Sequence, residues 1–229
     1  MSVSISSFAT ALSTSDNTPV RYRRTASDSD PAILSAIYEE EVNIATWHRT
    51  LPKAFQGSIA ELLDQAPTLE LILTTTPQSA QENVRAALPE KFGGSLAEDI
   101  AELVGMFCFL FDLKRAGLRL VILHEAMCPR FHVDKIPCRL VTTYTGRGTE
   151  WLHHESVDRG KLGAKDRGLS DDQIGVYKHR DDILALNCGD VALLKGETWD
   201  SNENGGLVHR SPHLTGGDRR LLLTLDFGS

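Results

Sequence analysis

Two histidines and an aspartate in this sequence carry side chains suited to binding a metal ion. His132 and Asp134 are separated by a single residue, and His209 comes much later in the chain. Two imidazoles and one carboxylate hold Fe(II) on one face and leave the other coordination positions open. The same side chains also suit zinc, manganese and nickel, so the residue types leave the metal undecided. We predict that His132, Asp134 and His209 form a metal site.

The spacing of these residues indicates how they come together. Residues 130–137 are typical of a strand end that runs into a turn. Residues i and i+2 of an extended chain point to the same face, which puts His132 and Asp134 side by side. A strand at residues 189–196, bounded by glycines, is followed by a polar loop that leads to His209. We therefore expect the third ligand to come from an adjacent strand.

The last strand of the chain carries candidates for binding an anion beside the metal. Within residues 218–227, alternation puts Arg220 on the more polar face and Arg219 on the other. Arginine suits a carboxylate because its planar guanidinium donates two parallel hydrogen bonds. We predict this role for Arg220, with Arg219 as the second choice; the alternative is that both cap the strand end in solvent. Tyr144 is either a further donor to the anion or a core residue.

In their order along the chain, these pieces resemble the iron and 2-oxoglutarate dependent oxygenases of the double-stranded β-helix (jelly-roll, cupin-like) fold, over residues 128–229 or so. The resemblance implies that His132, Asp134 and His209 bind Fe(II). It also implies that Arg220 binds the distal carboxylate of 2-oxoglutarate as co-substrate. The sequence departs from the pattern at Leu222, where many members of the superfamily carry Ser or Thr. This departure bears on the co-substrate clamp more than on the metal site.

The chain is also similar to a bacterial family catalogued as domain of unknown function 1826, over residues 30–229 or so. The similarity lies in residues 43–49 (NIATWHR), residues 131–140 (FHVDKIPCRL) and residues 148–152 (GTEWL). No substrate is assigned to that family, so this resemblance leaves the substrate open.

Helical patterns lie mainly in the first half of the chain and strand patterns in the second. Helices are predicted at residues 31–48, 58–63, 78–88 and 96–116. Strands are predicted at residues 69–74, 118–125, 140–144, 183–186, 191–194 and 221–227. This separation favours an α+β fold, with a jelly roll in the C-terminal half and the N-terminal helices packed on its outside.

The domain organisation follows from composition. Residues 1–29 are rich in serine and threonine and lack the apolar core of a secretory signal, so we expect a flexible tail. Residues 30–229 are expected to form a single domain. Within it, residues 30–116 are predicted to be a mainly helical cover and residues 117–229 the β-helix core with the metal site.

A polar segment at residues 153–182 separates the predicted strands of the C-terminal half. It is interpreted either as a loop that covers the substrate or as an inert insertion. His153 and His154 at its start are a weak candidate for a second metal site, because adjacent residues of an extended chain point in opposite directions.

Charge and hydropathy exclude some classes of partner. The net charge is −7, which argues against general binding to nucleic acid or anionic membranes. The sequence contains no run near the ~18 apolar residues of a membrane span. We expect a cytoplasmic protein, and the sequence leaves its oligomeric state open.

Together these patterns predict a non-haem iron dioxygenase, an oxidoreductase that uses 2-oxoglutarate to oxidise an unidentified small-molecule or protein substrate. Two alternatives stay open. One is a cupin-like metalloenzyme that uses the same ligands without 2-oxoglutarate, and the other is a non-catalytic metal-binding or sensing protein.

Overall fold

The computed structural model describes residues 22–92, 94–163 and 168–228. Within these ranges the fold is mixed α+β, with a large sheet of strand order β1-β2-β8-β5-β10-β4-β3 and a small sheet of order β7-β6-β9. The strands of the large sheet are β1 (Arg24–Asp28), β2 (Val42–Trp47), β3 (Glu70–Thr75), β4 (Ala116–Leu123), β5 (Cys138–Thr145), β8 (Val191–Lys195) and β10 (Arg220–Phe227). Those of the small sheet are β6 (Glu150–Leu152), β7 (Ile183–Ala185) and β9 (Val208–Arg210).

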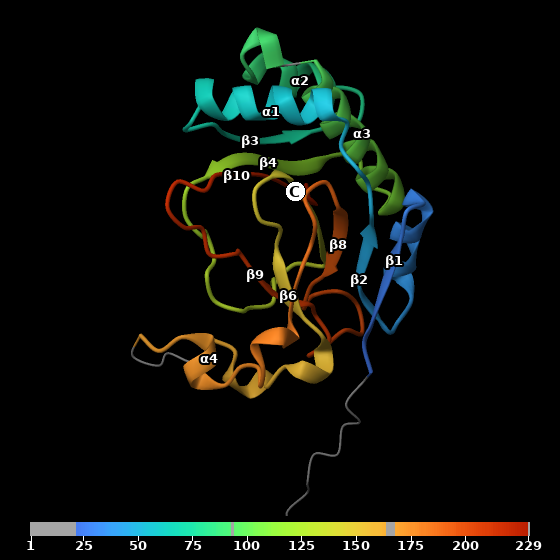
Figure 1. Cartoon of the computed structure of the whole chain (residues 1–229). Helices are drawn as coiled ribbons and strands as arrows, with labels where there is room; N and C mark the ends of the chain where they lie inside the picture. The colour runs from blue at the N-terminus through green and yellow to red at the C-terminus, as the bar shows by residue number, and fades with distance from the viewer. Residues whose placement is uncertain (1–21, 93, 164–167, 229) are drawn as a thin grey trace, which may run out of the picture.

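Helices α1 (Lys53–Gln65), α2 (Ala80–Ala87) and α3 (Ser95–Leu110) cover one face of the large sheet (Figure 1). In α1 the buried residues recur at helical spacing, with Phe55, Ile59 and Leu62 on one face. These side chains belong to the same apolar core as the helix-facing residues of the sheet. The shorter helices are η1 (Pro31–Tyr38), η2 (Glu90–Phe92), η3 (His154–Ser156), η4 (Arg159–Lys161), α4 (Asp171–Ile174) and η5 (Arg180–Asp182).

Strand β10 shows how the large sheet separates its two faces. It pairs antiparallel with β4 and β5, so it lies inside the sheet. Leu221, Leu223 and Leu225 are buried in the core shared with the helices. Arg220 and Leu222 point to the opposite face, as alternation predicts. That opposite face is the one on which the candidate site is built.

A second apolar cluster lies between the large and small sheets. It joins residues of β5, β8 and β10 to Leu207 and Trp151, the latter from β6. The small sheet therefore lies across the face of the large sheet that the helices leave uncovered (Figure 1). The space between the two sheets is where the inward-facing polar residues meet.

The N-terminal segment differs from its prediction. The helix predicted at residues 31–48 is wrong: η1 ends at Tyr38 and the chain continues as β2. Five consecutive residues of β2 are buried, because β1 and β8 flank this strand on its two edges and both of its faces are covered. A strand buried on both faces has a continuous apolar pattern, which periodicity alone does not separate from a helix.

Two other expectations need correction. Strand β1 falls within residues 1–29, which were predicted to be a flexible tail; residues 1–21 of that tail lie outside the described ranges. Residues 30–116 are mainly helical, as expected, but β2 and β3 within them also belong to the large sheet. The β-sheet is assembled from both halves of the sequence.

Residues 153–182, as far as the structure describes them, contain short helical turns that pack beneath the small sheet. Val176 and Tyr177 are buried against Phe131 and Leu152. Helix α4 begins with a capping box formed by Ser170 and Gln173.

The described helices include none long and apolar enough to cross a membrane.

Candidate metal centre

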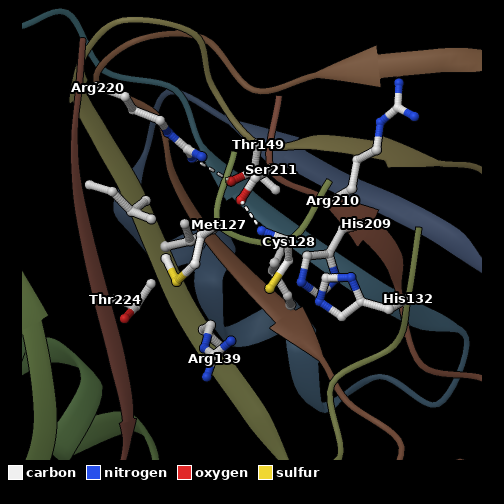
Figure 2. A pocket seen from close by; sticks show the side chains of 13 residues that line it. Met127, Cys128, His132, Arg139, Thr149, His209, Arg210, Ser211, Arg220 and Thr224 are labelled. Atoms are coloured by element: carbon white, nitrogen blue, oxygen red, sulfur yellow. Dashed lines mark hydrogen bonds between the residues drawn. The ribbon is translucent and has the colours of Figure 1, made fainter. Parts of the chain in front are cut away.

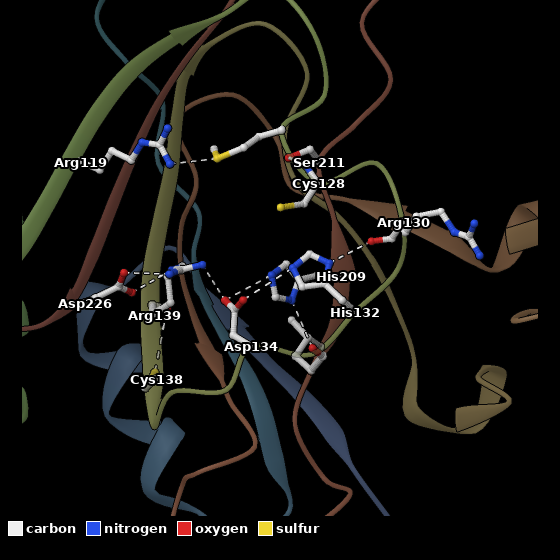
Figure 3. A network of polar contacts seen from close by, with 12 residues as sticks. Arg119, Cys128, Arg130, His132, Asp134, Cys138, Arg139, His209, Ser211 and Asp226 are labelled. Atoms are coloured by element: carbon white, nitrogen blue, oxygen red, sulfur yellow. Dashed lines mark hydrogen bonds and ion pairs between the residues drawn. The ribbon is translucent and has the colours of Figure 1, made fainter. Parts of the chain in front are cut away.

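The structure brings the three predicted ligands together (Figure 3). His132 and His209 form an isolated antiparallel bridge in which each backbone N–H donates to the other's carbonyl at 3.0 Å. Asp134 faces both rings: its Oδ1 lies 3.6 Å from His132 Nε2, and its Oδ2 lies 3.5 Å from His209 Nε2. One potential ligand atom from each residue lies within 4.8 Å of the others.

Backbone carbonyls orient both imidazoles for metal binding. His132 Nδ1 lies 2.9 Å from the carbonyl oxygen of Arg130, and His209 Nδ1 lies 3.2 Å from that of Leu207. A carbonyl oxygen only accepts hydrogen bonds, so each Nδ1 carries the proton. Each Nε2 then presents its lone pair toward Asp134, which is the arrangement that histidine ligands of metals adopt. The residues present therefore fit a divalent cation.

The electrostatics of the triad reflect its close packing. Burial by itself disfavours a charged carboxylate, yet the contacts with His132 and His209, which donate from Nε2 when the rings are protonated, and the nearby Arg139 hold the pKa of Asp134 well below its usual range. The contact with Asp134 in turn raises the pKa of His132. In the metal-free protein, a proton on His132 supplies positive charge next to the Asp134 carboxylate.

Metal binding is expected to depend on pH through His132. A metal needs the neutral imidazole, so the apparent affinity should fall about tenfold for each pH unit below the raised pKa of His132 and level off above it. In the metal-free protein the sign is opposite. The His132–Asp134 contact stabilises the fold below pH 6.5, and its contribution is lost as the pH rises through the raised pKa. Calorimetric titration in buffers of different ionisation enthalpy measures the released proton; zero release near neutral pH contradicts this expectation.

Arg220 is a buried cation that lines the same pocket as His132 and His209 (Figure 2). It is 1% exposed and donates hydrogen bonds to the hydroxyls of Thr143 and Thr149 at 2.7 to 3.1 Å. Among the described residues no carboxylate pairs with it, and burial lowers its pKa to about 10. The charge of Glu150 offsets only part of this effect of burial. A buried guanidinium without a carboxylate in direct contact is costly, so this position favours an anionic ligand.

The pocket connects the metal ligands to Arg220. His132 and His209 line one part of it and Arg220 another. Apolar walls come from both sheets and from the segments between them. The remaining lining residues are Met127, Cys128, Arg139, Val141, Thr149, Leu194, Arg210, Ser211, Leu222 and Thr224.

Tyr144 and Arg219, the two other predicted anion-binding residues, lie on the helical side of the sheet. Tyr144 is 1% exposed, and its hydroxyl donates to Asp99 at 2.6 Å. Arg219 donates to the carbonyl of Leu63 and to Asp64. These two assignments are corrected: alternation along β5 and β10 turns both side chains away from the pocket.

Replacing Tyr144 with phenylalanine is therefore expected to affect stability and not ligand binding. The change removes a buried hydrogen bond to the Asp99 carboxylate, which should lower the free energy of unfolding by about 1–3 kcal/mol. Urea denaturation measures this difference. Loss of 2-oxoglutarate binding with unchanged stability would instead place Tyr144 in the site.

Three residues of the site were missed by sequence reasoning. The hydroxyls of Thr143 and Thr149 accept hydrogen bonds from Arg220. This chain has Leu222 where many members of the oxygenase superfamily that it resembles carry a Ser or Thr hydroxyl. Arg139 binds Asp134. Alternation along β5 puts Arg139 and Thr143 on one face, and this pattern could have predicted that both face the site. Thr149 lies in the loop between β5 and β6, where no periodic pattern predicts the direction of a side chain.

His153 and His154 do not join the triad. The ring of His153 packs edge-on against Trp151, and His154 Nδ1 lies 3.3 Å from Arg159 Nη2. Burial, and then the charge of Arg159, lowers the pKa of His154 to about 4, so His154 is neutral at physiological pH.

Comparison with known proteins identifies the family. The family described as "Protein of unknown function (DUF1826)" matches residues 28–226, and the chain belongs to it. No curated protein matches the chain.

Several solved structures resemble the chain. A rice dioxygenase for auxin oxidation has 10% sequence identity and a TM-score of 0.47, with 81% of this chain and 73% of that one covered. A putative oxygenase from Shewanella oneidensis has 9% identity and a TM-score of 0.49, with 90% and 89% covered. The Arabidopsis thaliana dioxygenase for auxin oxidation 1, solved with 2-oxoglutarate, has 9% identity and a TM-score of 0.46, with 90% and 92% covered. At these scores the function has to be argued from the site itself.

Proposed function

We propose that the protein is a non-haem oxygenase that uses Fe(II) and 2-oxoglutarate to hydroxylate a small-molecule or protein substrate. The observation that carries the proposal is the buried Arg220, which has no carboxylate in direct contact among the described residues and shares a pocket with His132 and His209, two of the three candidate ligands. A metal site alone fits many activities. A metal site beside a buried cation fits a co-substrate that carries a carboxylate.

Each residue has a defined task in this proposal. The Nε2 atoms of His132 and His209 and the Asp134 carboxylate would hold the metal. Arg220, with the hydroxyls of Thr143 and Thr149, binds the distal carboxylate of 2-oxoglutarate, and its planar fork sets the orientation of that group. When bound, Fe(II) and 2-oxoglutarate supply the oxidising chemistry, while the protein supplies orientation and protection from side reactions.

The two-sheet arrangement supports the proposal because it is consistent with a jelly roll, in which two sheets face each other. The large and small sheets face each other across an apolar cluster. His132 and His209 extend the small sheet through their bridge, and Arg220 begins β10 of the large sheet. The site therefore uses both sheets, which fits a ligand held between them.

The deciding experiment adds Fe(II) and then 2-oxoglutarate to metal-free protein under anaerobic conditions. Chelation of the keto acid should produce a weak visible charge-transfer band that is absent in the His132→Ala variant. If the metal binds and 2-oxoglutarate does not, the proposal is refuted. A cupin-like enzyme without this co-substrate, or a metal-binding or sensing protein, would then take its place.

A further inference from the structure

Arg139 joins the candidate ligand Asp134 to a second carboxylate, Asp226 (Figure 3). Its Nη1 donates to Asp134 Oδ2 at 2.7 Å. Its Nε and Nη2 donate to the two oxygens of Asp226, each at 2.8 Å. This second contact is a two-bond fork, which fixes the plane of the guanidinium as well as its position. Asp226 therefore holds Arg139 with Nη1 turned toward Asp134.

The two strands that carry this pair, β5 and β10, are neighbours in the middle of the large sheet. Arg139 begins the inward face of β5, and Asp226 lies near the end of β10, one residue beyond the paired Leu140 and Leu225. Asp134 lies in the loop before β5, where its carbonyl accepts the backbone N–H of Glu197. Arg139 and Asp226, in the middle of the large sheet, thus fix the carboxylate of Asp134 in the adjoining loop.

We propose that Arg139 is a positioning residue that makes Asp134 a ligand through Oδ1 alone. This inference rests on the proposed function, because it needs a metal at the triad. A carboxylate with two free oxygens binds a divalent cation through one oxygen or through both. The hydrogen bond from Arg139 engages Oδ2, so a second coordination position is kept open for co-substrate or oxygen.

The location of Arg139 supports this role over a purely structural one. Its guanidinium lines the pocket that contains His132, His209 and Arg220. The bidentate partner Asp226 neutralises its charge, so Arg139 can sit beside a cation without strong repulsion. A pair that only joined β5 to β10 would need no third hydrogen bond to a loop carboxylate.

The test is Mn(II) binding to the full chain, with coordinated waters counted from the broadening of the Mn(II) electron paramagnetic resonance signal in isotope-labelled water. Arg139→Gln should bind Mn(II) with one coordinated water fewer than the wild type and with about 10- to 100-fold lower affinity. Asp226→Asn should change both quantities in the same direction and by less, because it loosens Arg139 without removing it. His132→Ala defines the background.

An unchanged water count and affinity in folded Arg139→Gln would overturn the inference, and a structural role predicts that result together with lower thermal stability. If Arg139→Gln does not fold, Asp226→Asn decides by the same two quantities. The outcomes also separate this inference from the proposed function. A wild type that binds Mn(II) and fails to bind 2-oxoglutarate refutes the proposed function only, and one that binds no metal refutes both.

Discussion

Replacing Arg220 with leucine is expected to weaken 2-oxoglutarate binding strongly while the metal stays bound. The guanidinium is buried and is the cation best placed to meet the co-substrate's distal carboxylate. Removing one partner of a buried, hydrogen-bonded charge pair costs about 2–5 kcal/mol, which is about 30- to 5,000-fold in affinity. Anaerobic titration of the Fe(II) form, followed by the charge-transfer band, measures this loss.

The neighbouring Arg219 offers a matched control, since it contacts Leu63 and Asp64 on the helical side of the sheet. Arg219→Leu should bind 2-oxoglutarate as the wild type does. Equal losses in the two variants would indicate a general effect of charge and would contradict the assignment of Arg220.

The same Arg220 variant is expected to keep or raise the free energy of unfolding without ligands. Leucine removes the cost of burying a cation that contacts no described carboxylate directly, and Leu222 and Val141 offer apolar neighbours in the pocket. Lower affinity with equal or higher stability is typical of a residue kept for function. A strong loss of stability would mean that Arg220 is structural.

Replacing His209 with glutamine should reduce metal affinity by more than about 100-fold. The loss of an outer-shell partner typically costs about 10- to 100-fold in metal affinity, and this change removes one of the three ligands themselves. His209 is 7% exposed, and glutamine is chosen to leave less empty volume than alanine would. Calorimetric titration with Fe(II) under anaerobic conditions or with Mn(II) measures the loss.

His213 provides the matched control for this variant. It follows His209 by four residues, is exposed, and belongs to no described metal-binding group. His213→Gln should bind metal as the wild type does. If His209→Gln retains wild-type affinity, the triad is not the metal site and the proposed function loses its basis.

Local sequence signals were sufficient to predict the three candidate ligands that the structure brings together. The i, i+2 spacing of His132 and Asp134 and the alternation along residues 220–226 are backbone properties that hold wherever the strand lies in the fold. They predicted the shared face of His132 and Asp134 and the inward face of Arg220. The late position of His209 indicated a neighbouring strand, and the His132–His209 bridge has that form.

Other features depended on pairing between distant segments. Strand β2 has a continuous buried pattern because both of its faces are covered: Val42 and Ala45 pack in the core shared with the helices and Ile44 in the cluster between the sheets. Periodicity could not separate such a strand from a helix. Strands β6 and β9 are three residues long, too short to show alternation. From the sequence, Tyr144 was either a donor to the anion or a core residue. Only the tertiary structure shows that it is a core residue, because its ring packs against Phe55 of α1 and its hydroxyl donates to Asp99.

The sequence by itself therefore determined which residue types could bind a metal and an anion, and it determined the shared face of His132 and Asp134 and the inward face of Arg220. These follow from composition and the two-residue repeat of a strand. Only the tertiary structure decided which face of the large sheet is covered by helices and which faces the small sheet. It alone brought Thr149 to Arg220 and Asp226 to Arg139, since these contacts join residues more than 70 positions apart. Such contacts depend on sheet order and loop closure, which no local pattern encodes.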